Sequence, residues 1–124
     1  MPVVEIYKEF RFEAAHYLPH APKGHPNARL HGHSFRAVVT LRGEVDPDKG
    51  WIRDFAAIEQ AMNDMRELLD HNMLNEIDGL ATPTLERLAV FIYDGLKPTV
   101  PEVAAVGVHR DSCNEGATYR GAQA

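Results

Sequence analysis

The sequence predicts an α+β fold in which a four-stranded antiparallel sheet carries two helices on one face, in the order strand, strand, helix, helix, strand, strand. Three observations predict this fold. Two long segments alternate apolar and polar residues, two later segments repeat apolar residues three and four positions apart, and two shorter strand-like segments follow near the C-terminus. A chain of 124 residues suits one domain with a real core, so residues 1–124 are expected to form a single domain.

The alternating segments run from Val4 to His16 and from His31 to Leu41, and they are expected to pair as a hairpin. Within each segment the side chains on one face are mostly apolar, which is typical of a strand with one buried face. The apolar positions are Val4, Ile6, Phe10, Phe12 and Ala14 in the first segment, and Phe35, Ala37, Val39 and Leu41 in the second. Residues 17–30 between them contain three prolines and two histidines without periodicity, which indicates a long, functional loop.

Cap residues and apolar spacing locate the two helices. Asp54 is expected to cap the first helix, which ends near Asp70. Thr82-Pro83-Thr84 indicates the start of the second helix, with the proline in its first turn, and Gly95 its end. The apolar positions are Phe55, Ile58, Met62, Met65 and Leu69 in the first helix, and Leu85, Leu88, Ala89 and Ile92 in the second.

The C-terminal part of the chain supplies the last two strands. Val103–His109 is apolar and partly β-branched, and residues 118–120 form a short candidate for the final strand. A sheet of four strands leaves exposed edges, which natural proteins cover or pair. Oligomerisation through these edges is therefore expected.

Composition excludes several classes of protein. The formal net charge is −5 and no basic cluster is visible, so nucleic acid is not an expected partner. No apolar run approaches the ~20 residues of a membrane span and no secretion signal is visible, so we expect no membrane partner and a cytoplasmic location. The single cysteine, Cys113, excludes an internal disulfide and is expected to be a small buried thiol.

Three histidines form a candidate metal site. His31 and His33 are one residue apart in a predicted strand, so both side chains leave the same face, and His16 ends the strand expected to pair with theirs. Three neutral imidazoles suit Zn²⁺ and leave a fourth position for water or substrate, as in catalytic zinc sites. Copper, nickel and iron also accept imidazole, and strand alternation with ordinary polar contacts is the alternative interpretation of the His-x-His pair.

Motif-like segments follow one another along nearly the whole chain. They are Phe12-Glu13-Ala14-Ala15-His16, Leu30-His31-Gly32-His33-Ser34-Phe35, Asp54-Phe55, Leu69-Asp70-His71-Asn72-Met73-Leu74-Asn75 and Pro83-Thr84-Leu85-Glu86. In order and spacing they resemble the motifs of the 6-pyruvoyl-tetrahydropterin synthase and 6-carboxy-tetrahydropterin synthase family. The resemblance implies a tunnelling fold (T-fold) subunit, assembled into trimers that pair as hexamers with sites between subunits. It also implies a pterin substrate, 7,8-dihydroneopterin triphosphate.

Position by position, the resemblance implies roles for several residues. His16, His31 and His33 become zinc ligands, with the metal binding the hydroxyls of the pterin side chain. Asp70 and His71 become a proton relay contributed by a neighbouring subunit, because a carboxylate beside an imidazole fixes its tautomer and supports its cationic form. The alternative interpretation is that this pair merely closes the helix, where the helix dipole favours a histidine.

Two positions depart from the family pattern. The catalytic cysteine of the family is replaced by Asn27, whose carboxamide neither titrates near neutrality nor accepts a transferred proton usefully. His25, or His20 in the same loop, is a candidate replacement base. The glutamate that holds the pterin ring in the family is replaced by Asp111, followed by Ser112, which keeps the carboxylate but shortens its reach.

Glu115 is a weaker candidate for holding the ring, and both acidic residues also fit an interpretation as solvated loop charges. Three functions remain open at this point. The chain is expected to be a zinc-dependent pterin synthase-like lyase with altered chemistry. The alternatives are a zinc- and pterin-binding homologue without synthase activity, and an assembly protein whose residual site only stabilises an oligomer.

Overall fold

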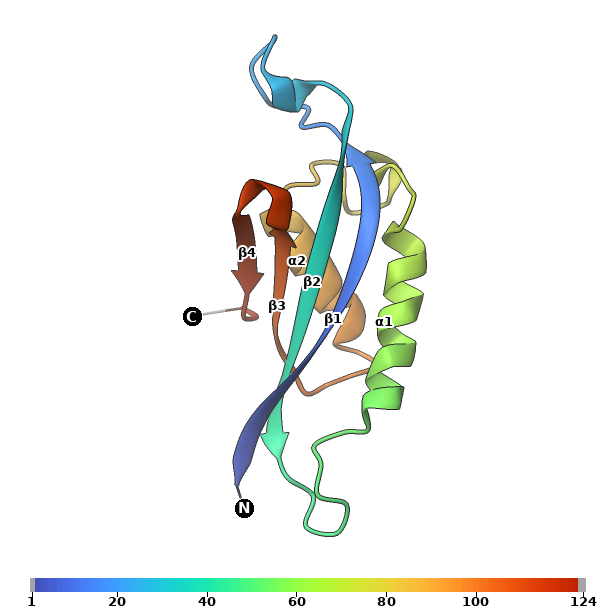
Figure 1. Cartoon of the computed structure of the whole chain (residues 1–124), viewed down its shortest axis with the longest axis vertical. Coiled ribbons are helices and arrows are strands. Elements are labelled where there is room, and N and C mark those ends of the chain that lie inside the picture. The colour runs from blue at the N-terminus through green and yellow to red at the C-terminus, as the bar shows by residue number, and fades with distance from the viewer. Residues whose placement is uncertain (1, 123–124) are drawn as a thin grey trace.

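A computed structural model describes residues 2–122, and its four strands form one antiparallel sheet in the order β1-β2-β3-β4. Both helices lie on the same face of this sheet (Figure 1), as the sequence predicts. The elements are β1 (Val3–His16), β2 (His31–Glu44), α1 (Phe55–Leu69), α2 (Leu85–Leu96), β3 (Val103–Arg110) and β4 (Glu115–Tyr119). Short 3-10 turns cover Pro26–Ala28, Leu74–Glu76 and Asp111–Cys113.

Three predicted boundaries were wrong. Thr84 caps α2 by accepting the Arg87 N–H at 3.2 Å, so Pro83 lies before the helix rather than in its first turn. Gly95 does not end α2, because the helix runs to Leu96 and the Lys97 N–H still donates to the Tyr93 carbonyl. The last strand begins at Glu115 rather than near residue 118. Asn114 has a left-handed backbone (φ 55°) that turns the chain, so that Glu115 already pairs with Arg110.

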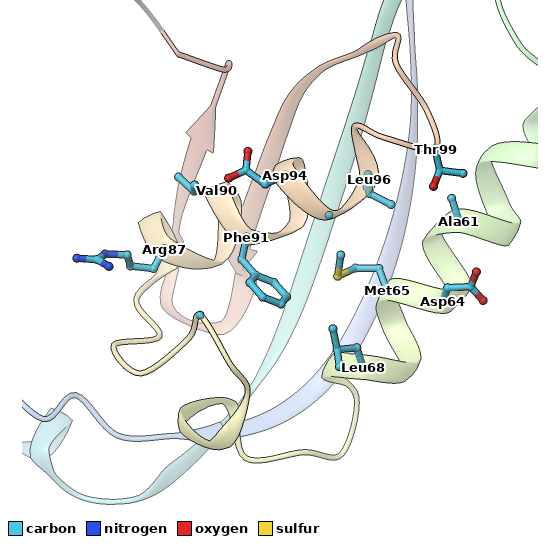
Figure 2. A pocket seen from close by; sticks show the side chains of 12 residues that line it. Ala61, Asp64, Met65, Leu68, Arg87, Val90, Phe91, Asp94, Leu96 and Thr99 are labelled. Atoms are coloured by element: carbon cyan, nitrogen blue, oxygen red, sulfur yellow. The ribbon is translucent and has the colours of Figure 1, made fainter.

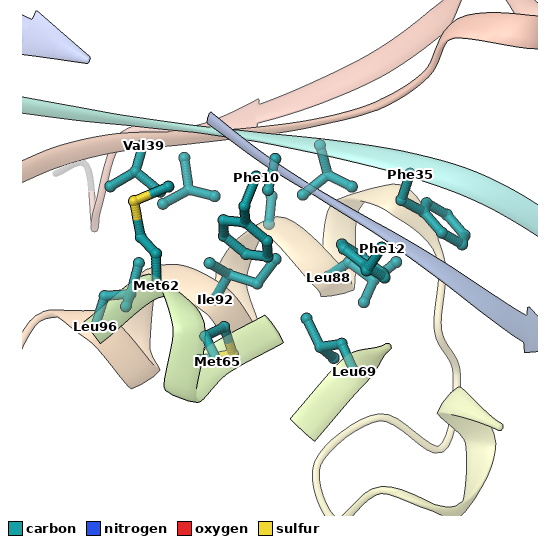
Figure 3. Packing of buried hydrophobic residues seen from close by; sticks show 14 of the residues in the cluster. Phe10, Phe12, Phe35, Val39, Met62, Met65, Leu69, Leu88, Ile92 and Leu96 are labelled. Atoms are coloured by element: carbon teal, nitrogen blue, oxygen red, sulfur yellow. The ribbon is translucent and has the colours of Figure 1, made fainter. Parts of the chain in front are cut away.

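The core lies between the helix-covered face of the sheet and the two helices (Figure 3), where Phe12 and Phe35 stack with ring centroids 5.0 Å apart. The predicted apolar faces of both long strands and both helices supply most of it. His16 belongs to the same face and is 1% exposed, the one fully buried polar residue among residues 2–122. The hydrophobic core therefore ends, at one end of the sheet, in an imidazole.

The outer edge of β1 is covered near His16 by the segment that follows α1. The Ala15 N–H donates to the Asn72 carbonyl at 3.1 Å, and the His71 N–H donates to the Glu13 carbonyl. The Asn75 side chain accepts the Tyr17 N–H at 3.0 Å and donates to the Tyr17 carbonyl at 2.8 Å. The end of β1 that carries His16 is thereby held on both sides.

Two surface features bear on the composition argument. Neither helix within residues 2–122 is long and apolar enough to cross a membrane. Cys113 is exposed, which corrects its predicted role as a buried thiol. It lies in the 3-10 turn between β3 and β4, none of whose three residues is buried.

Adjacent leucines at the end of α1 test the predicted packing. Leu69 is fully buried whereas Leu68 is 45% exposed, so the same substitution removes very different contacts. We expect Leu69→Ala to lower the free energy of unfolding by about 2–5 kcal/mol. The matched control, Leu68→Ala, should cost under about 1 kcal/mol. Urea unfolding followed by circular dichroism measures both, and equal losses would contradict the packing described for α1.

Candidate metal centre

The pairing of β1 with β2 brings the three histidines together. His16 lies directly opposite His31, and Ala14 lies opposite His33. All three imidazoles therefore project from the helix-covered face of the sheet at neighbouring positions. One ring nitrogen from each residue lies within 4.8 Å of the others. The ring centroids are 4.6 to 5.1 Å apart and the planes cross at 67° to 87°, so the rings converge edge-on rather than stack. This arrangement can hold a metal ion.

Backbone carbonyls fix the tautomers of two of these rings. Nδ1 of His16 lies 2.9 Å from the Pro83 carbonyl oxygen, and Nδ1 of His31 lies 2.7 Å from the Arg29 carbonyl oxygen. A carbonyl oxygen only accepts, so each Nδ1 carries the proton in the neutral ring and each Nε2 carries a lone pair. These two Nε2 atoms face each other at 3.0 Å. Two lone pairs at that separation repel unless a cation lies between them.

Burial favours the neutral form of two of the imidazoles, His16 and His33. Desolvation is the main cause that lowers the pKa of His33 from 6.5 to about 4, and the positive charge of Arg110 is the next. Desolvation also lowers the pKa of His16, against the opposing effect of the Pro83 carbonyl. A neutral imidazole is the form that binds a metal, so these two rings need not lose a proton to metal near neutral pH.

Arg110 is a neighbour of the triad that the sequence analysis missed. Its Nη1 lies 3.4 Å from His33 Nε2, and its Nη2 lies 2.9 Å from a Glu115 carboxylate oxygen. Every second residue of β3 lies on the same face, which carries Val106, Val108 and Arg110. An arginine at the end of an apolar strand face was therefore the feature of the sequence that could have identified Arg110. Glu115, the weaker candidate for holding a ring, is the ion-pair partner of this arginine.

Asp70 and His71 form the expected carboxylate–imidazole pair, with His71 Nδ1 2.9 Å from Asp70 Oδ2. The other Asp70 oxygen accepts the Glu13 N–H at 2.8 Å, and this hydrogen bond is the main cause that lowers the pKa of Asp70. The His71 imidazole is 78% exposed. Its backbone is left-handed (φ 58°), a conformation that costs a residue with a Cβ about 1 kcal/mol or more.

The loop between β1 and β2 carries Asn27 in the 3-10 turn Pro26–Ala28. His25 caps this turn, because its Nδ1 accepts the Asn27 N–H at 3.1 Å. The Asn27 carbonyl accepts the Leu18 N–H at 2.8 Å, which closes the base of the loop. His20 is exposed at the tip of the same loop. Figure 1 shows this loop extending beyond the end of the sheet that carries the triad.

Asp111 is engaged by arginines. Its two carboxylate oxygens accept Nε and Nη2 of Arg36, each at 3.0 Å, and Arg11 Nη1 lies 3.3 Å away. The bidentate pair with Arg36 is the main cause that lowers the pKa of Asp111. Ser112 contacts Cys113, with Oγ and Sγ 3.8 Å apart. A pterin ring that binds Asp111 must therefore share or displace Arg36.

Two hollows of the surface include at most one histidine of the triad. One of about 900 Å³ lies between α1 and α2, lined by apolar side chains such as Met65, Leu68 and Phe91 (Figure 2). Another, of about 460 Å³, lies along the β1 edge and is lined by residues that include His33 and His71 but neither His16 nor His31. Neither of these two hollows therefore brings all three histidines together with His71.

Comparison with known proteins identifies relatives across nearly the whole chain. A family model described as 6-pyruvoyl tetrahydropterin synthase matches residues 5–122. The 6-carboxy-5,6,7,8-tetrahydropterin synthase of Synechocystis is 38% identical over an alignment of 122 positions, which covers 92% of this chain and 91% of that protein. The dihydroneopterin monophosphate aldolase of Pyrococcus furiosus is 31% identical over 90 residues, 73% of this chain and 75% of that protein.

A solved structure agrees with these sequence matches. The structure of Caenorhabditis elegans 6-pyruvoyl tetrahydropterin synthase superposes with a TM-score of 0.84 at 29% identity. The superposition covers 98% of each chain. The similarity therefore includes all four strands and both helices.

Proposed function

This chain belongs to the 6-pyruvoyl tetrahydropterin synthase family, and on that premise we propose that it is a zinc-dependent lyase acting on the side chain of a pterin. The proposed metal ligands are His16, His31 and His33. The observation that carries this proposal is the pair of Nε2 lone pairs facing each other at 3.0 Å between rings whose Nδ1 atoms are tied to carbonyl oxygens. Zinc bound there would polarise an oxygen of the substrate as a Lewis acid.

The donor set suits zinc. Three imidazole nitrogens with second hydrogen bonds to backbone carbonyls, seen here for His16 and His31, are typical of histidines that bind this metal. Phe35 lies beneath the site, with its ring centroid 5.7 Å from that of His33 and 5.9 Å from that of His16. This apolar ring would shield a bound ion from water on that side of the site.

Asp70 and His71 are the proposed proton carriers. Asp70 orients the His71 imidazole through Nδ1, which leaves Nε2 free to take or give a proton at the substrate. The left-handed backbone of His71 supports a chemical role, because glycine would fit that position with less strain if the residue only ended the helix. The exposed imidazole is proposed to act on substrate held by the triad of a neighbouring subunit.

The substrate is proposed to be 7,8-dihydroneopterin triphosphate or a related dihydropterin. Asp111 is the proposed acceptor for the amino group and adjacent N–H of the ring, with Ser112 beside it. Because Arg36 occupies both oxygens of Asp111, ring binding is proposed to require that Arg36 rotate toward its other partner, Glu9, which it already contacts at 2.8 Å.

Asn27 favours altered chemistry over the usual synthase reaction. A carboxamide at the position of the family's catalytic thiol leaves no base there, and His25, two residues away, is the proposed replacement. The aldolase among the relatives makes cleavage of a carbon–carbon bond in the side chain the proposed variant of the reaction. The same substitution favours a second candidate function, a zinc- and pterin-binding protein without synthase activity.

The active form is proposed to be a cytoplasmic homohexamer made of two trimers. Val3, Val4 and Tyr7 support association through β1, because they are 46%, 38% and 65% exposed along an edge strand. Light scattering of the purified protein measures the mass directly, and a monomer at micromolar concentration would contradict this part of the proposal.

One incubation separates the candidate functions. Zinc-loaded protein is mixed with 7,8-dihydroneopterin triphosphate, and both the solution and the protein-bound ligand are analysed by mass spectrometry. A lyase converts the substrate, and the mass of the product distinguishes loss of triphosphate from carbon–carbon cleavage. Substrate retained intact supports the binding protein. The His31→Ala variant is the matched control, and neither conversion nor retention by the wild type would contradict a pterin function.

Restoring the thiol tests whether the rest of the site is competent. We expect Asn27→Cys to produce or increase synthase activity, because a thiol near a metal can lose its proton and act as a base. Asn27→Ser is the control, since it has a similar size without a titrating group near neutral pH. Product formation equal in both variants would show that the base lies elsewhere, with His25 as the next position to substitute.

A further inference from the structure

Arg110 lies where a cation is unexpected, beside three residues proposed to bind a metal dication. It is the last residue of β3, on the face that also carries Val106 and Val108, and its side chain is only 17% exposed. Its three nitrogens have different surroundings. Nη2 pairs with Glu115 at 2.9 Å, Nη1 lies 3.4 Å from His33 Nε2, and Nε is buried without an acceptor.

The ion pair with Glu115 explains only part of this placement. It uses a single nitrogen, whereas a bidentate pair such as that between Arg36 and Asp111 uses two. Within residues 2–122, Arg110 Nε is the buried side-chain nitrogen that lacks a partner. A buried guanidinium that remains partly unsatisfied costs free energy, so Arg110 would gain from an anionic group close by.

Metal binding removes the weak acceptor that Arg110 has. When the lone pair of His33 Nε2 coordinates a metal, it no longer accepts a hydrogen bond from Nη1. The local charge then consists of a dication and a guanidinium against the single carboxylate of Glu115. An anionic oxygen in the open coordination position satisfies both requirements at once, because it offsets the excess positive charge and accepts the Nη1–H.

We propose that Arg110 favours an anionic oxygen at the metal, either a carboxylate or the alkoxide that a side-chain hydroxyl of the proposed dihydropterin forms when it gives its proton to the proposed base, His71 of a neighbouring subunit. This inference rests on the proposed metal centre and deepens it, because it names the chemical class of the group at the fourth position. A neutral hydroxyl could accept the same hydrogen bond, but it would leave the excess charge uncompensated. Arg110 is accordingly a specificity-determining residue for the side chain of the substrate.

Cobalt-substituted protein provides a test that does not depend on turnover. Co²⁺ replaces zinc in imidazole sites and has visible absorption bands that respond to the fourth ligand. Acetate is titrated as the anionic probe and acetamide as its neutral counterpart. The proteins are the wild type, Arg110→Met, Arg110→Lys and the control Arg42→Met. Arg42 is 60% exposed and pairs with Glu5 on the uncovered face of the sheet.

We expect acetate to bind wild-type cobalt protein about tenfold or more tightly than the Arg110→Met variant, the usual effect of losing a hydrogen bond to a charged group. Arg110→Lys should lie between them, because it keeps the charge with a different geometry. Arg42→Met should equal the wild type, and acetamide should bind all four proteins with similar, weaker affinity. Cobalt itself should bind Arg110→Met at least as tightly as it binds the wild type.

The outcomes distinguish failure of the proposed role of Arg110 from failure of the proposed metal centre. Equal acetate affinity in the wild type, Arg110→Met and Arg110→Lys, with normal cobalt spectra, would overturn the role of Arg110 and leave the metal centre intact. If Arg110→Met fails to fold, the Arg110→Lys comparison decides alone, and acetate affinity equal to that of the wild type would count against the proposal. No cobalt spectrum in the wild type would overturn the metal centre and, with it, this inference.

Discussion

The antiparallel register of β1 and β2 is the constraint on which the rest of the site depends. Opposition of His16 to His31 and of Ala14 to His33 places three imidazoles on the face that also holds the stacked pair Phe12 and Phe35. A shift of one residue would turn every one of these side chains to the other face of the sheet. The packing of the apolar residues thus specifies the register, and the register in turn assembles the histidines.

Burial at the end of the core explains the chemical state of the histidines. Desolvation keeps His16 and His33 neutral, and backbone carbonyls determine which nitrogen of His16 and His31 carries the lone pair. Pro83, just before α2, supplies the constraint on His16, and Arg29, in the loop between β1 and β2, supplies that on His31. The segment after α1 holds the end of β1 in place. The scaffold therefore orients the imidazoles before any ligand arrives, as an efficient metal site requires.

Much of the fold could be predicted from the sequence because its pattern is regular. Alternation of apolar and polar residues fits only a strand, and apolar residues three and four positions apart fit only a helix. The predicted cap of α1 at Asp54 was confirmed. The last strand was harder to delimit, because Gly116 and Ala117 have weak strand propensity. They pair with β3 because the turn at Asn114 brings them alongside it. Gly95 was misread because glycine commonly follows the end of a helix, whereas here it lies in the last turn of α2 beside the side chain of Met65.

The candidate site was predictable where its residues are close in sequence or share a strand face. His31 and His33 follow from strand parity, and His16 from the expected hairpin. Contacts between distant segments were not accessible in the same way, since the Arg36–Asp111 pair depends on the register of β2 with β3 and on the turn after β3. Arg110 was overlooked for the same reason, because its proximity to His33 arises only when β3 pairs with β2.

Metal content is the most direct measure of the central claim, that the three imidazoles converge because they bind one zinc ion. Elemental analysis of purified protein should find about one zinc per chain. His31→Ala should lose it, whereas His20→Ala, an identical change in the exposed loop, should retain it. Zinc absent from the wild type and not taken up on addition, or equal zinc in both variants, would contradict the account.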